Sequence, residues 1–143
     1  METIDFRLEF ESFFVSNPPK FSIYNNNKII FKETSVEDLY TAEFSLPMSN
    51  QIKNVLQIMR TNHDERTDQQ LTLKKVYADD IDLENILNQG KYYPIYPEPW
   101  HSQQKEQNND LPEYYSGSLC WGWNGVWKLE YTTPFYTWLL KNV

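Results

Sequence analysis

The chain has 143 residues, 40% of them hydrophobic, which is the length of one domain and enough to bury a core without disulfide bonds. The formal net charge of -7 excludes sequence-independent binding to a phosphate backbone, which needs clustered lysine and arginine. The single cysteine, Cys120, excludes an internal disulfide framework and fits a protein that folds in a reducing cytoplasm. We therefore expect one domain over residues 1–143 and no nucleic-acid partner.

Six segments are predicted to form strands, most of them because apolar and polar residues alternate along them. They lie at residues 3–15, 21–24, 28–31, 41–48, 54–60 and 70–78. Pro18 and Pro19 end the first strand because proline cannot donate a hydrogen bond to a strand ladder. The asparagines at 25–27 tolerate left-handed backbone angles, so they predict a hairpin between the second and third strands. Pro47 limits the fourth strand to a sheet edge, and residues 33–38 are expected to form a loop.

The pattern is less regular between residues 79 and 117. A short helix is predicted over residues 82–88, and Gly90 follows it where a left-handed cap is expected. Residues 91–117 are rich in proline and tyrosine and contain the polar run QQKEQNND. We expect a long loop here that packs in part through its aromatic rings, and loops of this length usually have a function or are mobile.

Asn124 and Gly125 stand between aromatic and β-branched residues, which is a strong sequence signal for a two-residue hairpin turn. A type I′ turn at this place would pair Trp123 with Val126, and Trp121 would then share a face with both. The opposite face would carry Cys120, Trp127, Leu129 and Tyr131. A one-sided sheet buries one of these sets, so the other should meet a second layer, a ligand or a partner.

Residues 132–143 favour a short terminal helix or an extended segment that closes the core. Pro134 suits the first turn of a helix, and Phe135, Trp138 and Leu139 would form its apolar stripe. Several short strands with turn signals between them, and one or two short helices, predict an all-β and mainly antiparallel fold. We expect a jelly-roll-like β-sandwich.

The aromatic residues, 16% of the chain, are the best candidates for a binding surface. Trp121 and Trp123 on the predicted hairpin would form it together with Trp100, Tyr114 and Tyr115. Indole and phenol rings supply rigid contact area with a polar tip, which suits both protein interfaces and the apolar faces of sugar rings. In the alternative interpretation the long loop covers the hairpin, and these rings belong to the core.

No arrangement of catalytic residues stands out in the sequence. His63 and His101 lie in predicted polar loops and outside any recognisable motif, and Cys120 is expected to be a small buried hydrophobe rather than a nucleophile. The 4 glycines of the chain cannot supply a phosphate-cradling loop. We therefore expect no enzymatic activity.

Calcium is the one metal ion for which the sequence offers ligands, because carboxylate oxygens suit it. Asp79, Asp80 and Asp82 are the candidates, and residues 64–68 form a second acidic group. A glycine-punctuated ligand loop surrounds neither group, so solvated acidic turns are the alternative interpretation. We expect no cofactor, with calcium at the three aspartates as the exception to test.

Three parts of the sequence resemble small jelly-roll proteins of tailed bacteriophages, some of which are similar to carbohydrate-binding modules. They are residues 55–58 with Asp68 and 71–76, the acidic stretch around Ile81 that leads into residues 83–87, and the ending WNGVWKLEYTTPFYTWLL. In that family a terminal strand that begins Gly-x-Trp precedes a proline-aromatic-x-x-tryptophan closure. Gly125, Trp127, Pro134, Phe135 and Trp138 match this pattern. The resemblance covers the last two thirds of the chain and implies a non-enzymatic role in a virion or in sugar binding.

Three functions are consistent with these observations. The first is a structural or assembly protein, on the resemblance a phage virion component made in the host cytoplasm, that contacts itself or neighbouring virion proteins. The second is a carbohydrate-binding module, and the third is a small acidic inhibitor or immunity-like protein, either of them cytoplasmic. Residues 1–11 alternate charged and apolar side chains, so we expect no signal peptide, and no segment is long enough to cross a membrane.

Overall fold

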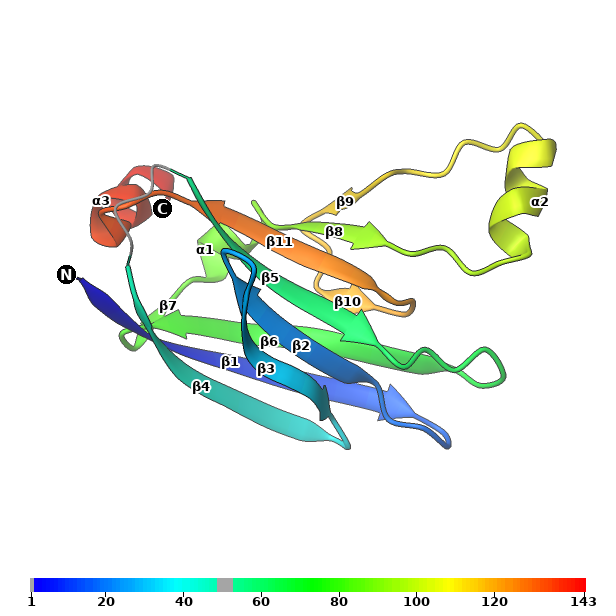
Figure 1. The fold of residues 1–143 in the computed structure, drawn as a ribbon, viewed down its shortest axis with the longest axis horizontal. Helices are drawn as coiled ribbons and strands as arrows, with labels where there is room; N and C mark the ends of the chain where they lie inside the picture. Colours follow the sequence, from blue (N-terminus) through cyan, green and yellow to red (C-terminus); the bar gives the residue numbers. More distant parts are fainter. Residues whose placement is uncertain (1, 49–52) are drawn as a thin grey trace.

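The computed structural model describes residues 2–48 and 53–143, which form a two-layer β-sandwich with three short helices (Figure 1). The strands of sheet A are β1 (Thr3–Phe14), β4 (Leu39–Pro47), β6 (Gln69–Ala78), β7 (Ile81–Asp82) and β10 (Cys120–Trp121). The strands of sheet B are β2 (Lys20–Asn25), β3 (Lys28–Ser35), β5 (Asn54–Thr61), β8 (Lys91–Pro94), β9 (Tyr115–Ser116) and β11 (Gly125–Tyr131). The helices are α1 (Glu84–Leu87), α2 (Trp100–Glu106) and α3 (Phe135–Asn142).

The strand order is β10-β6-β1-β4 in sheet A, where β7 also pairs with β6, and β3-β2-β5-β11-β8-β9 in sheet B. The pairings between these strands are antiparallel. The chain passes repeatedly from one sheet to the other, so that neighbours in a sheet are often distant in sequence. This arrangement confirms the predicted all-β, jelly-roll-like sandwich.

The core lies between the two sheets and consists of the alternate residues that the strand pattern predicted to be buried. In β1, the inward residues Ile4, Phe6, Leu8 and Phe10 are at most 4% exposed. From sheet B, Phe21 stacks on Phe10 with ring centroids 4.3 Å apart. Removal of this apolar surface from water is the main contribution that holds the two layers together.

The predicted turn between the second and third strands is confirmed. Asn26 and Asn27 have φ angles of 50° and 66°, in the left-handed region that asparagine tolerates better than most residues. Strand β3 continues into residues 33–38, where Thr34 pairs with Phe21. The loop predicted at 33–38 is therefore shorter than expected.

Residues 91–117, predicted to form one long loop, contain the strands β8 and β9 and the helix α2. Strand β8 joins sheet B because Tyr92 pairs with Trp127 of β11. The prediction was wrong here because a strand of four residues is too short to show alternation, and this one ends at Pro94, a residue that strands usually avoid.

The hairpin predicted at Asn124 and Gly125 does not form. Strand β10 pairs with β6 in sheet A, whereas β11 pairs with β5 and β8 in sheet B, so the chain crosses between the sheets at this point. Neither residue has the positive φ that a type I′ turn needs. The predicted division of the indoles between two faces is therefore wrong. Trp121 and Trp127 both face the core, with ring centroids 6.5 Å apart.

Two positions, Gly90 and Gly125, need glycine because a core ring packs closely against the backbone there, and not because of turn geometry. A Cβ atom on Gly125 would lie 2.6 Å from the Tyr92 ring, and one on Gly90 would lie 2.5 Å from the Trp127 indole. Side-chain carbons almost never approach other atoms so closely, so either substitution would push a core ring out of place. The left-handed cap predicted at Gly90 is wrong because its φ is not positive.

Helix α3 confirms the predicted terminal helix, and it closes the end of the sandwich where both chain termini lie (Figure 1). Its buried residues are Phe135, Trp138 and Leu139. The rings of Phe135 and Trp138 pack against Tyr131, with centroids 5.7 and 6.0 Å away. The backbone N–H of Phe135 donates to Glu2 at 2.9 Å, so the first and last parts of the fold are joined. None of the helices among the described residues has the length and apolar character needed to cross a membrane.

Candidate functional site

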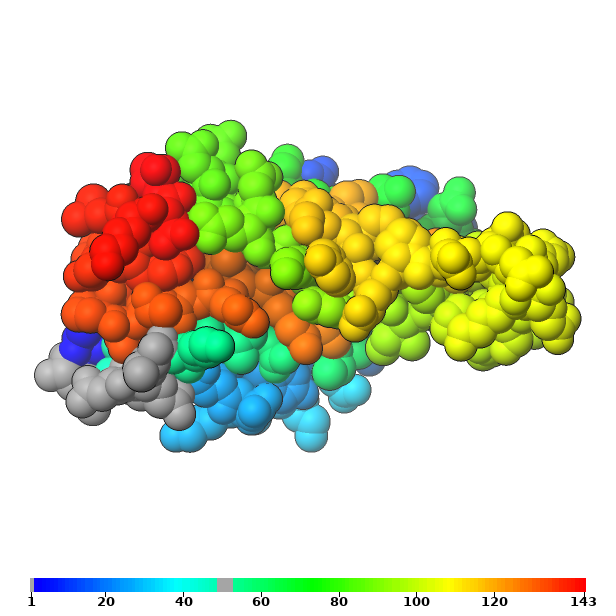
Figure 2. Space-filling view, turned by 90° about the horizontal axis from the view of Figure 1, so that it is seen from above, coloured from blue at the N-terminus to red at the C-terminus, as the bar shows by residue number. Residues whose placement is uncertain are grey.

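The end of the sandwich opposite α3 is open and carries a projecting arm, residues 95–113, which includes α2 (Figure 1). Figure 2 shows this arm as the yellow lobe that extends beyond the body of the molecule. The side chains of α2 are all exposed or partly exposed. The loop between β5 and β6, residues 62–68, lies at the same end (Figure 1). The arm and this loop therefore lie close enough to form a site together, beside the segment that follows β1.

Aromatic rings join the arm to the body. Trp100 of α2 lies against Trp123 with ring centroids 5.5 Å apart, and Tyr96 meets Trp123 edge-on at 5.4 Å. Tyr96 also contacts Trp100 at 6.0 Å and His101 at 5.2 Å. All four rings are partly buried. The cluster holds the arm in place and still presents aromatic surface to solvent.

Trp123 borders a groove of about 640 Å³ between the arm and the 62–68 loop. Its apolar walls are Trp123, Pro97 and Val15. Its polar walls come from the loop and consist of His63, Asp64, Glu65, Arg66, Thr67 and Asp68. The groove thus sets one indole among hydrogen-bonding groups of both charges.

A buried polar network holds the 62–68 loop in its shape. Arg60 of β5 is fully buried; its Nη2 donates to Gln69 Oε1 at 2.7 Å, and its Nη1 donates to Asn124 Oδ1 at 3.2 Å. The same two oxygens accept from the loop backbone, from the N–H of Asp64 at 3.2 Å and that of His63 at 2.9 Å. Because each amide oxygen serves both the guanidinium and the loop, the side chains beneath the loop determine its geometry.

Burial lowers the pKa of the Arg60 guanidinium because the interior solvates a charge poorly. In the described part of the chain, no carboxylate forms an ion pair with Arg60, and its Nε has no hydrogen-bond partner. Burial, and secondly the charge of Arg60, lower the pKa of His63. The His63 imidazole is therefore neutral near pH 7 and offers one donor and one acceptor.

The carboxylate of Asp64 accepts hydrogen bonds from within the 62–68 loop. Its Oδ1 accepts the backbone N–H of Arg66 and its Oδ2 accepts the hydroxyl of Thr67, each at 2.9 Å. These bonds, the one from Arg66 first, lower the pKa of Asp64, so the carboxylate is ionised and already occupied. Glu65, Arg66 and Asp68 have exposed side chains, which leaves them accessible to a ligand.

Trp123 also lines a second hollow, with a volume of about 280 Å³. Tyr115 and Cys120 border it, together with the core rings of Tyr92 and Trp121, which stack with centroids 4.9 Å apart. The Tyr92 hydroxyl donates to the Trp123 carbonyl oxygen at 2.5 Å and so links the core to the site. Cys120 is exposed, which contradicts its predicted burial.

A comparison with solved structures places this fold. The chain is similar to the structure of vCBM60 in complex with galactobiose, with a TM-score of 0.53 and 10% sequence identity, over 87% of this chain and 96% of that one. The fold is that of a carbohydrate-binding-module-like β-sandwich. No protein-family model matches the sequence, and the comparison with curated proteins gives no match.

The five aromatic residues predicted for binding do not form one surface. Trp100 and Trp123 lie together at the groove, and Tyr115 shares the second hollow with Trp123. Tyr114 instead packs against the outer face of sheet B. Trp121 is 1% exposed, so it belongs to the core, as the alternative interpretation of these rings proposed.

Sequence reasoning missed the residues that support the groove. The pattern predicts Asn124 as a turn residue, Arg60 as the last residue of a strand, and Gln69 as part of the polar loop between the strands at 54–60 and 70–78. A signal for Arg60 was present, because it continues the alternation of Leu56 and Ile58 on the buried face of β5. A charged residue at a buried position indicates a supporting polar network.

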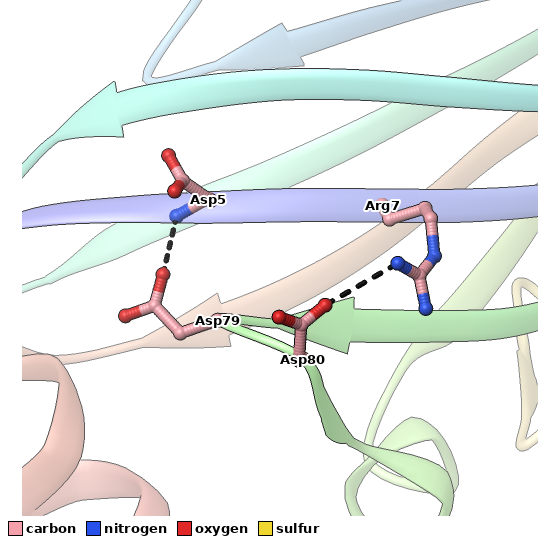
Figure 3. Close-up of polar contacts among 4 residues, drawn as sticks. All are labelled: Asp5, Arg7, Asp79 and Asp80. Atoms are coloured by element: carbon pink, nitrogen blue, oxygen red, sulfur yellow. Dashed lines mark hydrogen bonds and ion pairs between the residues drawn. The ribbon is translucent and has the colours of Figure 1, made fainter.

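The calcium candidates lie at the other end of the sandwich, Asp79 and Asp80 in the turn after β6 and Asp82 in β7. Asp79 accepts from the backbone N–H of Asp5 at 2.8 Å and from the hydroxyl of Tyr136. Asp80 forms an ion pair with Arg7 at 3.3 Å. Figure 3 shows these two aspartates directed toward separate partners along β1.

The third candidate, Asp82, forms an ion pair with Lys75 at 3.0 Å. Each of the three carboxylates thus has a protein partner. Within residues 2–48 and 53–143, no group of three or more histidine, cysteine or acidic side chains is arranged to hold a metal ion. Calcium binding at this turn stays a prediction.

Proposed function

We infer that this protein binds carbohydrate at the groove bordered by Trp123. The observation that carries the proposal is the position of one half-buried indole beside the polar side chains of the 62–68 loop. A sugar ring has an apolar face that stacks on an aromatic ring and a rim of hydroxyls that need hydrogen-bond partners. The groove offers both kinds of contact.

The parts of the groove have different roles in this proposal. Trp123 supplies the stacking surface, and Trp100 supports and extends it. His63, Glu65 and Arg66 supply donors and acceptors for sugar hydroxyls. The buried network keeps these groups in place before the ligand arrives, which reduces the conformational entropy lost on binding.

The fold supports a binding role without catalysis, since the structurally similar vCBM60 was solved in complex with galactobiose. A groove whose side chains have both charges and neutral donors suits an uncharged saccharide with many hydroxyls. Neutral polysaccharides, galactans among them, are therefore the first ligands to test.

Affinity electrophoresis in gels that contain soluble neutral polysaccharides tests the proposal. We expect at least one polysaccharide to slow the wild-type protein, and Trp123→Ala to abolish this effect. Trp100→Ala should weaken binding less, because Trp100 contacts Trp123 but does not line the groove itself. The control is Tyr77→Ala, which removes a half-buried ring from sheet A and should leave binding unchanged.

Chemical denaturation of the same variants separates lost binding from lost structure. Trp123→Ala should keep the free energy of unfolding within about 1 kcal/mol of the wild type, because its ring is only partly buried. Binding that survives Trp123→Ala, or a wild-type protein that no polysaccharide slows, would contradict the proposal.

Assembly through strand edges is a second candidate function, and the edges of the sandwich favour it. Strands β3 and β4 are edges of sheets B and A, and Ile29 on β3 and Leu39 on β4 are 50% and 68% exposed. Unpaired edges with apolar side chains can pair with another chain. The resemblance to phage proteins extends this candidate to a virion component, and an acidic inhibitor stays a third prediction.

Light scattering after size exclusion, at low and high salt, tests the assembly candidate. A discrete oligomer that persists in high salt would support self-contact through apolar edges, since salt screens only charged contacts. A monomer at both salt concentrations would contradict self-assembly.

A further inference from the structure

A separate groove lies on the outer face of sheet B and has a volume of about 330 Å³. Strands β8 and β11 and helix α3 form its walls through Tyr93, Lys128 and Trp138. Figure 2 looks onto this face, where β11 (orange) lies between α3 (red) and the arm (yellow). The residues that line this groove differ from those of both hollows at Trp123.

The lining of this groove is basic, although the chain has a net charge of -7. Lys53, Lys91 and Lys128 line it alongside the carboxylate of Glu130. As far as the structure describes the chain, none of the three lysines forms an ion pair with a carboxylate. Elsewhere on the sheets, Lys74 and Lys75 form ion pairs with Glu11 and Asp82, whereas Lys20, Lys28 and Lys32 form none among the described residues. What sets the groove apart is that its lysines are gathered in one hollow.

Two of these lysines face each other directly. Lys91 of β8 lies opposite Lys128 of β11 in the antiparallel pairing, and both side chains lie on the outer face. Like charges at such opposed positions destabilise a sheet. Each ammonium lies over a tyrosine ring, Lys128 Nζ 4.8 Å from the centroid of Tyr93 and Lys91 Nζ 4.7 Å from that of Tyr114. A ring attracts a cation but does not neutralise it, and no described carboxylate lies within ion-pair distance of either ammonium.

We propose that this groove binds an acidic polysaccharide of the polyuronate class through its carboxylate groups. A carboxylate between Lys91 and Lys128 replaces their repulsion with two charge-assisted hydrogen bonds. Lys53 adds a third charge, and the ring of Tyr93 offers apolar surface to the sugar. The need for an anion rests on the lysines alone; that a saccharide carries it rests on the function proposed above.

Binding of polygalacturonate, compared with its methyl-esterified form, tests this proposal, because the ester keeps the sugar backbone and removes the charge. We expect the wild-type protein to bind the acid form about tenfold or more tightly, since charge-assisted hydrogen bonds are the stronger kind. Lys91→Gln/Lys128→Gln should abolish this preference. The matched control, Lys74→Gln/Lys75→Gln, removes the same charge from lysines that already form ion pairs and should keep the preference.

Several outcomes would overturn the proposal. One is equal binding of the acid form and the ester, and another is an equal loss of the acid preference in both double variants. A third is that inorganic sulfate displaces the bound acid form as strongly as the free polymer does, which would indicate a simple anion site. The unfolding free energy of Lys91→Gln/Lys128→Gln should stay close to that of the wild type, because the variant removes both a repulsion and two contacts between an ammonium and a tyrosine ring, and these effects oppose each other. Lost binding in this variant would then not reflect unfolding.

Trp123→Ala separates this proposal from the function of the Trp123 groove. If the acid preference persists in Trp123→Ala while neutral polysaccharides no longer bind, both proposals are supported. If the wild-type protein binds the acid form and no neutral polysaccharide, the Trp123 proposal fails and the lysine groove is supported. Loss of the acid preference in Trp123→Ala would place the acidic ligand at the Trp123 groove and overturn the present proposal.

Discussion

The two ends of the sandwich are both rich in aromatic residues, but only one of them is closed. At the α3 end, Tyr131, Phe135 and Trp138 pack against one another and are at most 7% exposed. At the open end, Trp100 and Trp123 lie 5.5 Å apart and both remain partly exposed. The closed end completes the core, and the open end forms a groove.

The difference between the ends lies in what surrounds the rings. At the α3 end the rings are buried among apolar side chains, and Tyr131 and Trp138 reach the lysine groove only with their edges of at most 7% exposure. At the open end a network of Arg60, Gln69 and Asn124 shapes a polar loop beside rings that stay partly exposed. Aromatic content alone therefore does not distinguish a core from a site, and the exposure of the rings beside polar groups does. Trp121 and Trp123 are two positions apart and fall on opposite sides of this division.

The largest effect on stability is expected from substitution of the two tryptophans that lie in the core. Trp121→Ala and Trp127→Ala each remove a buried indole and should lower the free energy of unfolding by about 3–5 kcal/mol. Chemical denaturation measures this loss, and Trp123→Ala is the matched comparison with a much smaller expected loss. If Trp121→Ala lowered the free energy of unfolding no more than Trp123→Ala does, the assignment of Trp121 to the core and Trp123 to the groove would be wrong.

Asn124→Ala should have a smaller effect on stability and a direct effect on the loop. The substitution leaves the donors of Arg60 and of the His63 backbone without their acceptor, at a cost of about 1–3 kcal/mol. Hydrogen exchange should become faster in residues 62–68 and stay unchanged in β1. The exposed Asn85 of α1 provides the control, since Asn85→Ala should alter neither. Unchanged exchange in the loop would mean that the network does not hold it.

The sequence was sufficient to predict the layers of the fold but not their connections. Alternation along β1, β4, β5 and β6 has a local cause, because each of these strands buries one face, and those strands were predicted correctly. An Asn-Gly pair such as Asn124-Gly125 gives the same sequence signal whether the chain forms a hairpin turn or crosses to the other sheet. Gly125 is a glycine because Tyr92 approaches it, and this contact between distant positions leaves no local pattern.

The candidate site shows the same limit. Trp100 and Trp123 were predicted to lie on a binding surface, and the structure brings them together, while Trp121 was assigned to that surface through the wrong hairpin register. The supporting role of Arg60 depends on Gln69 and the crossing segment being its neighbours. That neighbourhood arises from the sheet topology, which the sequence pattern does not specify.

A smaller effect, at the closed end, is expected from pH. The hydroxyl of Tyr136 in α3 donates to the carboxylate of Asp79, which lowers the pKa of Asp79 and raises that of Tyr136 to about 12. The folded pKa of Asp79 is below its unfolded value, so its contribution to stability is present above about pH 4 and is lost as the pH falls. The folded pKa of Tyr136 is above its unfolded value, so its contribution is present below about pH 10 and is lost as the pH rises.

Tyr136→Phe should therefore flatten the dependence of the unfolding free energy on pH at both limits, measured by denaturation at a series of pH values. The control is Tyr24→Phe on β2, which removes a tyrosine hydroxyl that is not bonded to Asp79 and should leave both slopes as they are. If the unfolding free energy of Tyr136→Phe depended on pH as steeply as that of the wild type, the hydrogen bond between Tyr136 and Asp79 would not stabilise the contact between α3 and the turn after β6.

The smallest effect on stability is expected from the projecting arm, although it carries part of the open site. Replacement of residues 103–109 by a short glycine-serine linker ends α2 early but keeps Trp100 and Tyr96 against Trp123. Because the side chains removed are exposed or partly exposed, the free energy of unfolding should change by about 0.5 kcal/mol or less. Saccharide binding, measured in the same gels as for Trp123→Ala, should be largely retained, since the rings stay in place. A loss of more than about 2 kcal/mol would be too large for exposed positions. The arm would then be part of the core, and both ends of the sandwich would be closed.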